Sequence, residues 1–432
     1  MSKSDERTIH VPVLARVEGE GALDLSIQDG EIKDLRLRIF EPPRLFEKFL
    51  EGHSYTEVPD MVARICGICP VAYQMSAIQA LEGLFDVDPG PWVRAMRRVF
   101  YCGEWIQSHA LHIHLLAAPD FLGFDNAMAM AKEYPEEVKR GLRLQAAGNQ
   151  LIGLFGGRSV HPVGARVGGF FHAPEKHDVK RVLELLKSLQ EDTEALIHWL
   201  ASFNLPEQEQ DFTYVALHHP DEYAMNEGRL VSSNGLDIPV EKFEQHFKEF
   251  QVPHSTSLHA SLNDAPYLVG PLARLNLNID QLPENIIEII KSTSFQFPSK
   301  NMFHSIIARA VEIYYALQEA TRTLGDYELP ECSYVDVKPI AGTGYGCTEA
   351  PRGLLWHRYD CDEQGKVTKA IIVPPTSQNQ GRIEDDLRTS LINFGLDKDD
   401  DALRNHGEMV IRNYDPCISC STHFLRIKVD RS

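Results

Sequence analysis

Apolar and polar residues alternate near both ends of the chain. In residues 9–40 the runs LDLSI and LRLRI alternate strictly and are separated by Asp29 and Gly30. A period of two around an Asp-Gly turn predicts a β-hairpin. The same reasoning predicts a second hairpin over residues 353–373, with its turn in the DEQG segment at 362–365.

Longer segments between these ends have apolar residues spaced three to four apart. Residues 91–118 and 176–203 begin near a proline and are expected to be long helices, as are residues 303–324. Residues 384–411 are expected to form a helix in two pieces. With strands at both ends and helices between them, we predict an α+β fold: a large helical bundle core with small β-hairpins or sheets near both ends. No linker or repeat divides the chain, which predicts a single domain over residues 1–423.

The charge balance narrows the classes of partner. The chain has 43 basic and 62 acidic residues, a formal net charge of −19, which argues against a nucleic-acid or anionic-membrane partner. No run of eighteen apolar residues occurs, and residues 1–8 lack the apolar stretch of a signal peptide. We therefore expect a cytoplasmic protein without a membrane span.

Four of the eight cysteines form two Cys-x-x-Cys pairs, and these are the strongest chemical signal in the sequence. The pairs are Cys66 with Cys69, and Cys417 with Cys420. Four thiolates suit zinc, an iron–sulfur cluster or another soft metal, and the spacing alone favours structural zinc. However, the pairs stand almost the whole chain apart, whereas the halves of a small zinc module lie close together. We expect the isolated cysteines to be buried apolar residues: Cys102, Cys332, Cys347 and Cys361.

The residues that flank the two pairs carry a family resemblance. RICGICP at 64–70 and DPCISCSTH at 415–423 resemble the two signature motifs of nickel–iron hydrogenase large subunits. Five other blocks resemble that family in the same order: ARVEGEG at 15–21, FEKFLEG at 46–52, GGRSVHPVGARVGG at 156–169, EAPRG at 349–353 and PPTSQN at 374–379.

The resemblance implies a nickel ion bound by all four cysteines and an iron that carries carbon monoxide and cyanide ligands. By position, Cys66 and Cys417 are expected to be terminal nickel ligands, with Cys69 and Cys420 bridging to the iron. Soft thiolates suit both metals. The implied activity is the reversible heterolytic cleavage of H2, with H2 and protons as substrates.

Three further residues match the family's catalytic positions. Glu18 matches its proton-relay glutamate, which would receive the proton from Cys417. Arg352 matches an arginine over the metal, where a guanidinium stays charged and can donate to cyanide. Asp415 is expected to be the partner of Arg352. The neighbouring Glu20 has no such match.

The resemblance also implies a magnesium site and a processing step. Glu47, His423 and the backbone carbonyl of Ile372 match the family's magnesium ligands, and a carboxylate-rich site suits this ion. Residues 424–432 follow the histidine at which a maturation endopeptidase cuts. We therefore expect this C-terminal extension to be removed once nickel-insertion proteins have acted.

Two departures from the family pattern indicate one branch of the family that the chain resembles. Tyr73 stands where many members have histidine, and Ser108 stands where oxygen-exposed respiratory enzymes have aspartate. These residues resemble the cytoplasmic, NAD(P)-linked and sulfhydrogenase-like branch. The expected partners are an iron–sulfur small subunit and diaphorase-type subunits that carry flavin, iron–sulfur clusters and NAD(P). The GTGYG run at 342–346 lacks the setting of a nucleotide-binding loop, so we expect no nicotinamide site in this chain.

Several interpretations stay open at this point. Within enzymes, the alternative is an F420-reducing or ferredoxin-linked hydrogenase subunit. A non-catalytic quinone-reductase-like subunit, whose family lacks the cysteines, and a structural zinc protein are the two remaining possibilities. Three histidines crowd one predicted helix, and we interpret them as packing residues ahead of proton-path residues: His109, His112 and His114.

Overall fold

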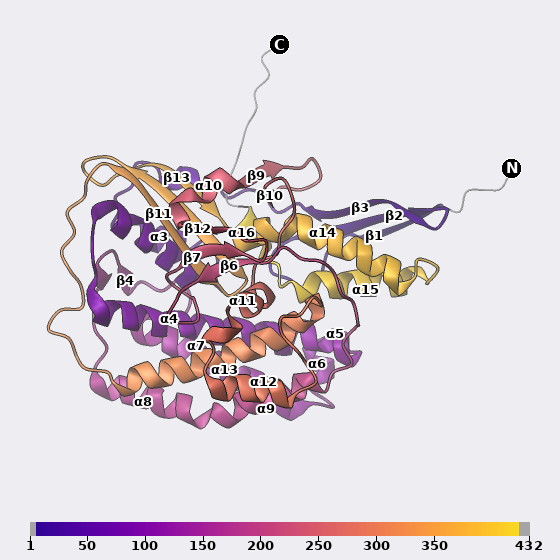
Figure 1. Ribbon diagram of the computed structural model, residues 1–432, viewed down its shortest axis with the longest axis horizontal. Coiled ribbons are helices and arrows are strands. Elements are labelled where there is room, and N and C mark those ends of the chain that lie inside the picture. The colour runs from indigo at the N-terminus through magenta and orange to yellow at the C-terminus, as the bar shows by residue number, and fades with distance from the viewer. Residues whose placement is uncertain (1–5, 423–432) are drawn as a thin grey trace, which may run out of the picture.

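Long helices fill one half of the molecule (Figure 1). The computed structural model describes residues 6–422. At its centre α4 (Gly90–Leu111) packs against α7 (Pro135–Gly156) and α13 (Ser305–Gly325), and α13 also contacts α8 (Lys176–Ser188) and α9 (Gln190–Ala201). Most residues of α4 from position 96 onward and most of α13 are buried. The burial of their apolar side chains therefore stabilises this half.

A three-stranded antiparallel sheet covers the helix that follows the first cysteine pair. Its strands are β11 (Gly342–Ala350), β12 (Gly353–Cys361) and β13 (Val367–Val373), and its first two strands pack on α3 (Pro70–Phe85). The β12–β13 hairpin confirms the predicted hairpin over 353–373, with β11 as an additional strand.

The GTGYG run lies in β11, where its glycines allow a close approach to α3. A Cβ at Gly344 would stand 2.0 Å from Ala80 O, and one at Gly346 would stand 2.1 Å from Ser76 O. Any larger residue would force the strand away from the helix. The packing accounts for these glycines and supports the exclusion of a phosphate-binding loop.

The N-terminal strands form a second antiparallel sheet, which extends to one side of the molecule (Figure 1). It has the order β1 (Glu6–Val11), β2 (Gly21–Gln28) and β3 (Glu31–Ile39), so the predicted first hairpin is confirmed and gains a strand. The C-terminal helices α14 (Pro375–Phe394) and α15 (Asp400–Asn413) pack against this sheet. The first strands and the late helices of the described residues therefore meet in one region.

The middle of the chain is less helical than predicted. β6 (Val215–His218), β7 (Arg229–Ser232) and β8 (Asp237–Ile238) form one sheet, and β9 (Phe247–Gln251) pairs with β10 (Leu258–Leu262). These strands share a small apolar core with β12. The α+β prediction is confirmed, and these strands add small sheets in the middle of the chain to those expected near both ends.

The helix predictions are confirmed with changed boundaries. Residues 303–324 correspond to α13, residues 176–203 are interrupted at Leu189, and residues 91–118 change at His112 into a π-helical turn. The two-piece helix begins earlier than expected, at Pro375. Among residues 6–422, none of the helices has both the length and the apolar character needed to cross a membrane.

The remaining elements are short. They are α1 (Phe46–Leu50), α2 (Val58–Val62), the π-helical turn His112–Ala117, α5 (Ala118–Leu122), α6 (Ala127–Met130), β4 (Ala165–Arg166), β5 (Gly169–Phe170), α10 (Phe243–His246), α11 (Pro271–Asn278), α12 (Glu284–Ser292), α16 (Ile418–Ser421) and the 3-10 turns Val240–Lys242, Ile279–Gln281 and Met302–His304.

The three histidines of α4 and its π-helical turn are buried and make the folded protein sensitive to acid. Burial lowers the pKa of His109 to about 4, of His112 to about 3 and of His114 to about 4. Each ring stays neutral in the folded chain but takes up a proton near its ordinary pKa of 6.5 once unfolded. The stability that each contributes is therefore present above pH 6.5 and is lost as the pH falls toward its folded-state pKa, which is about 4 for His109 and His114 and about 3 for His112.

Replacing His114 with glutamine should reduce this acid sensitivity. Between pH 6.5 and 5 the wild type should lose about 1.5 kcal/mol more unfolding free energy than His114→Gln, because one protonation in the unfolded state is removed. Denaturant unfolding of both proteins at the two pH values measures the difference. His177→Gln is the control, since that side chain is 79% exposed. Equal acid sensitivity in wild type and His114→Gln would contradict the prediction.

Candidate metal centre

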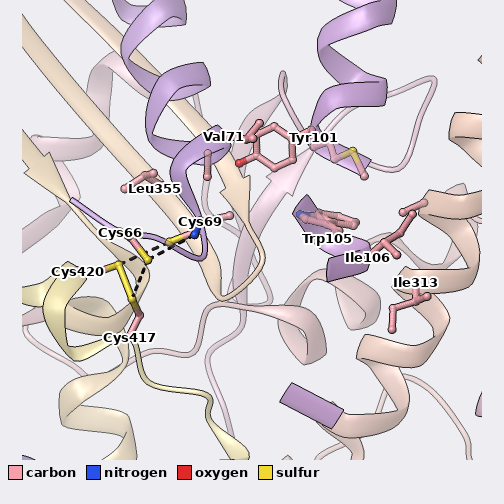
Figure 2. Close-up of a cluster of buried hydrophobic side chains, with 14 of the residues drawn as sticks. Cys66, Cys69, Val71, Tyr101, Trp105, Ile106, Ile313, Leu355, Cys417 and Cys420 are labelled. Atoms are coloured by element: carbon pink, nitrogen blue, oxygen red, sulfur yellow. Dashed lines mark hydrogen bonds between the residues drawn. A yellow bond between two sulfur atoms is a disulfide. The ribbon is translucent and has the colours of Figure 1, made fainter. Parts of the chain in front are cut away.

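The two cysteine pairs meet in the interior (Figure 2). Cys66 and Cys69 lie on the loop before α3, and Cys417 and Cys420 lie at the start of α16 and within it. Their four sulfurs all lie within 4.8 Å of one another, and no cysteine of the four is more than 4% exposed. This arrangement is the one that the sequence argument predicted, and it provides four soft ligands for one buried metal site.

Each sulfur of the first pair faces one sulfur of the second. Cys66 Sγ lies 3.5 Å from Cys417 Sγ, and Cys69 Sγ lies 3.6 Å from Cys420 Sγ. The two expected terminal ligands are thus neighbours, as are the two expected bridges. The sulfurs of Cys417 and Cys420 are also in contact (Figure 2), so the four sulfurs form one compact group.

Side chains from other segments hold the two cysteine loops together. The Nη2 atom of Arg44 donates to the carbonyl of Ile65 at 2.6 Å and also to the carbonyl of Ser419, so one guanidinium spans both loops. The hydroxyl of Thr376, in the first turn of α14, accepts from Cys417 N at 3.0 Å. Neither residue was predicted from the sequence, although Thr376 lies in the PPTSQN block.

Glu104 is a further buried group that sequence reasoning missed. Its carboxylate accepts from Val71 N at 2.6 Å and from Ala72 N at 3.0 Å, two of the free N–H groups in the first turn of α3. Burial raises the pKa of Glu104 well above its ordinary value. The sequence signal that could have identified this residue was a glutamate between apolar residues of the predicted helix 91–118. The Glu104 carboxylate fixes the start of α3, the helix that follows Cys69.

Glu18 lies directly against the second cysteine pair. Its Oε2 atom is 3.2 Å from Cys417 Sγ and accepts from Ser419 N at 3.0 Å, while its backbone carbonyl accepts from Ile418 N at 2.9 Å. Glu20, two residues on, is exposed. The structure therefore places Glu18 beside the cysteines and Glu20 at the surface, as the motif indicated.

Gly19 allows this close contact. It has a φ of +90°, and a Cβ there would stand 2.6 Å from Ile418 Cβ. A side chain would both strain the backbone and displace the loop that carries Cys417. The glycine of the motif thus places the Glu18 carboxylate.

Arg352 and Asp415 form the ion pair that the sequence predicted. Arg352 Nε donates to the Asp415 carbonyl at 2.8 Å and Nη2 donates to Oδ1 at 3.0 Å, and both residues are 3% exposed. Burial alone would lower the pKa of Arg352, but Asp415 and the thiols of Cys69 and Cys66 raise it further than burial lowers it. The guanidinium is therefore charged at any working pH.

One buried N–H group of Arg352 has no hydrogen-bond acceptor among the described residues. Among the described residues, Arg352 Nη1 has no hydrogen-bond partner although it is buried, and the same holds for Tyr73 OH. A buried unpaired donor is costly. A group with acceptor atoms bound at the cysteines would satisfy it, so the residues present fit a metal that carries such ligands.

A network of buried charges fixes the loop before Arg352. Arg274 is 0% exposed and binds Glu312 of α13 through two bonds of 2.7 Å and Glu349 of β11 through one of 3.0 Å. The same guanidinium donates to the carbonyls of Ala350 and Pro351 at 2.7 and 3.0 Å. Arg274 therefore ties the helical half to the loop that presents Arg352.

Removing the carboxylate partner of Arg352 should destabilise the fold. Asp415→Ala leaves a buried guanidinium without its anion, and such a loss costs about 3–5 kcal/mol. Asp415 has a φ of +55°, a conformation rare outside glycine that the arginine helps to hold. Chemical unfolding of the purified variant measures the loss, with the exposed Asp397→Ala as control. A loss of less than about 1 kcal/mol, little more than a surface substitution causes, would contradict this role.

The predicted magnesium ligands are partly brought together. Glu47 Oε1 accepts from Ile372 N at 2.8 Å, so α1 and β13 place these two residues side by side. Arg44 N donates to the Thr422 carbonyl at 2.8 Å, which brings the last described residue close to α1. His423 lies outside the described residues.

The other sequence-based residues are buried with one exception. Ser108 and the three histidines are 0% exposed, and each histidine has a hydrogen bond, which agrees with a packing role. Among the isolated cysteines, the expected burial is confirmed for Cys102, Cys347 and Cys361. It is wrong for Cys332, which is exposed in the long segment before β11.

Comparisons with known proteins agree with this geometry. A family model described as nickel-dependent hydrogenase matches residues 44–141 and 261–423. The alpha subunit of sulfhydrogenase 1 from Pyrococcus furiosus is 32% identical over 98% of this chain and 100% of that protein. The F420-non-reducing hydrogenase from Methanothermobacter thermautotrophicus has a subunit that is 31% identical over 95% of this chain and 93% of its own length.

A solved structure matches almost the entire fold. The crystal structure of an NAD+-reducing NiFe hydrogenase in the H2-reduced state superimposes with a TM-score of 0.87 at 27% identity. The match covers 96% of this chain and 99% of that one. The mid-chain sheets as well as the helical half therefore belong to the shared fold.

Proposed function

Because this chain belongs to the nickel-dependent hydrogenase family, as a catalytic large subunit, we propose that it splits H2 reversibly and passes the electrons through an iron–sulfur small subunit to NAD(P). One observation carries the proposal. Four buried sulfurs lie within 4.8 Å of one another, and the carboxylate of Glu18 lies against one of them.

Each cysteine has a distinct proposed role. Cys66 and Cys417 would hold nickel as terminal ligands, and Cys69 and Cys420 would hold both the nickel and an iron that carries carbon monoxide and cyanide. The contacts of 3.5 and 3.6 Å between the two pairs support one shared metal site, while the division of roles rests on the family resemblance. When bound, the metal pair would supply polarisation of H2 for heterolytic cleavage and accept its two electrons, so that both protons leave through groups of the chain.

The residues of this chain then handle the proton. Cys417 Sγ accepts a proton from H2, and Glu18 Oε2, at 3.2 Å, takes it from the sulfur. The N–H of Ser419 holds the carboxylate in this position. A carboxylate at hydrogen-bond distance is a competent proton acceptor.

Two more groups complete the proposed centre. Arg352 Nη1, the buried donor left over, would donate to the cyanide ligands, and Asp415 positions the guanidinium. Glu47, the Ile372 carbonyl and His423 would bind magnesium, which favours oxygen ligands and retained water. The contact between Glu47 and Ile372 supports this assignment.

We also propose that residues 424–432 are removed by a maturation endopeptidase after nickel insertion. Until the cut, the extension would keep the second cysteine pair accessible. Intact mass spectrometry of the active enzyme tests this step. A chain ending at His423 is expected, and an active enzyme that retains residues 424–432 would contradict the proposal.

The electron acceptor is proposed on the branch resemblance and on the similarity to an NAD+-reducing enzyme. Nicotinamide and flavin would bind partner subunits in the cytoplasm. The purified complex should reduce NAD+ or NADP+ under H2, followed as absorbance of the reduced nucleotide. Reduction of F420 or ferredoxin alone would favour the alternative branch and leave the metal centre unaffected.

A further inference from the structure

Two histidines and a glutamate form a second cluster of metal-binding side chains, distinct from the four cysteines. His254 lies in the turn between β9 and β10, His259 lies in β10, and Glu384 lies in α14. One ligand atom from each lies within 4.8 Å of the other two. The elements that carry them meet beside the N-terminal sheet (Figure 1).

Glu384 already binds two neighbours. Its Oε1 atom accepts from His254 Nε2 at 2.9 Å and from Leu37 N of β3 at 2.9 Å. An ion pair with one histidine would account for this much. That ion pair leaves His259 without a role.

His259 is the residue that an ordinary ion pair leaves unexplained. It is 3% exposed, and its Nε2 atom is buried without a hydrogen-bond partner among the described residues. Its ring lies edge-on to that of His254, with centroids 5.9 Å apart. Buried polar nitrogens are nearly always paired, so this one calls for a ligand.

The electrostatics of the cluster favour a cation. Burial, and then the charge of His254, lower the pKa of His259 to about 4, so its ring is neutral and has a lone pair to offer near neutral pH. Burial raises the pKa of Glu384. A nearby dication would offset the cost of keeping that carboxylate ionised.

We propose that His254, His259 and Glu384 bind one divalent transition-metal ion of the zinc type. Two imidazoles and one carboxylate suit zinc, whereas magnesium and calcium prefer oxygen ligands throughout. The side chains of His254 and Glu384 are 19% and 18% exposed, so solvent reaches the cluster. Water from that side would complete a four-ligand set.

The position on α14 gives the ion a structural consequence. Glu384 stands eight residues after Thr376, about 12 Å along the helix at 1.5 Å per residue. Thr376 is the residue that binds the backbone of Cys417. The ion therefore fastens the β9–β10 hairpin and β3 to the helix that positions the nickel-binding loop.

Metal counting on the purified hydrogenase tests the site. The complex is dialysed against EDTA, equilibrated with Zn²⁺ and washed, and its zinc, nickel and iron are measured by mass spectrometry. Wild type should hold one zinc more than His259→Gln or Glu384→Gln, and all should contain the same nickel. His246→Gln, in the same part of the chain but outside the cluster, should bind as wild type does. Equal zinc in wild type and both cluster variants would overturn the proposal.

X-ray absorption at the zinc edge gives a test that needs no variant. Zinc-loaded wild type should show imidazole scattering with Zn–N distances of about 2.0–2.1 Å. Zinc bound by sulfur at about 2.3 Å would place the ion at the cysteines and overturn the assignment. Neither result depends on the identity of the electron acceptor.

Discussion

Cys417→Ala is expected to abolish nickel retention and H2 oxidation together. The variant loses the proposed terminal nickel ligand, which is the same sulfur that lies 3.2 Å from Glu18 Oε2. Three thiolates leave the nickel under-coordinated, and no neighbouring oxygen matches a thiolate in softness. Nickel per chain, measured by mass spectrometry, should fall to background, and H2 uptake should fall below detection.

Cys347→Ala is the matched control for this variant. Cys347 is as buried as Cys417, but it lies in the small core formed with the mid-chain strands. Its replacement removes one sulfur from an apolar environment and should leave nickel content unchanged. A nickel-replete and active Cys417→Ala protein would refute the ligand assignment.

Glu18→Gln should slow turnover while nickel and iron contents stay at wild-type levels. The amide can keep the hydrogen bond from Ser419 N, but it cannot take a proton from the sulfur. Removing one positioned proton acceptor costs roughly 10²–10⁴-fold in rate. H2 oxidation with an artificial acceptor measures the rate independently of the partner that binds nicotinamide.

Glu20→Gln provides the comparison for Glu18. It lies two residues away on the same segment, is exposed, and its backbone rather than its side chain bonds Glu41. It should keep full activity. Unchanged turnover in Glu18→Gln would remove this residue from the proton path, and lost metal content would give it a structural role instead.

Local patterns were sufficient for the parts of the fold that depend on local chemistry. The Asp29–Gly30 turn and the alternation around it predicted β2 and β3, because both turn residues adopt positive φ. The same signals could not reveal β11. Its glycines match helix α3 rather than a turn, and that contact is visible only in three dimensions.

Packing against distant segments explains where the observed helices and strands differ from the predicted ones. The helix is interrupted at Leu189 although apolar spacing continues through residues 176–203, because α8 and α9 each pack separately against α13. The mid-chain strands are short and share a core with β12, which lies about a hundred residues later. No window of local sequence contains that information.

The residues of the candidate site also fall into a group that local motifs predicted and a group that they did not. The four cysteines, Glu18 and Arg352 lie in motifs and were predicted, whereas Arg44 was not. An arginine in a polar segment has no signal of its own, and its role follows only from the meeting of both cysteine loops. Spacing alone favoured zinc, and the family resemblance was needed to predict nickel and iron.

Infrared spectroscopy of the purified enzyme, with nickel and iron counted on the same sample, decides whether the four cysteines hold a nickel–iron centre. Carbon monoxide and cyanide bound to iron absorb in a region that is free of protein bands. We expect such bands and one nickel ion for each copy of this chain, with more iron than nickel because the small subunit carries iron–sulfur clusters. Zinc at the four sulfurs, with no bands in that region, would contradict this expectation.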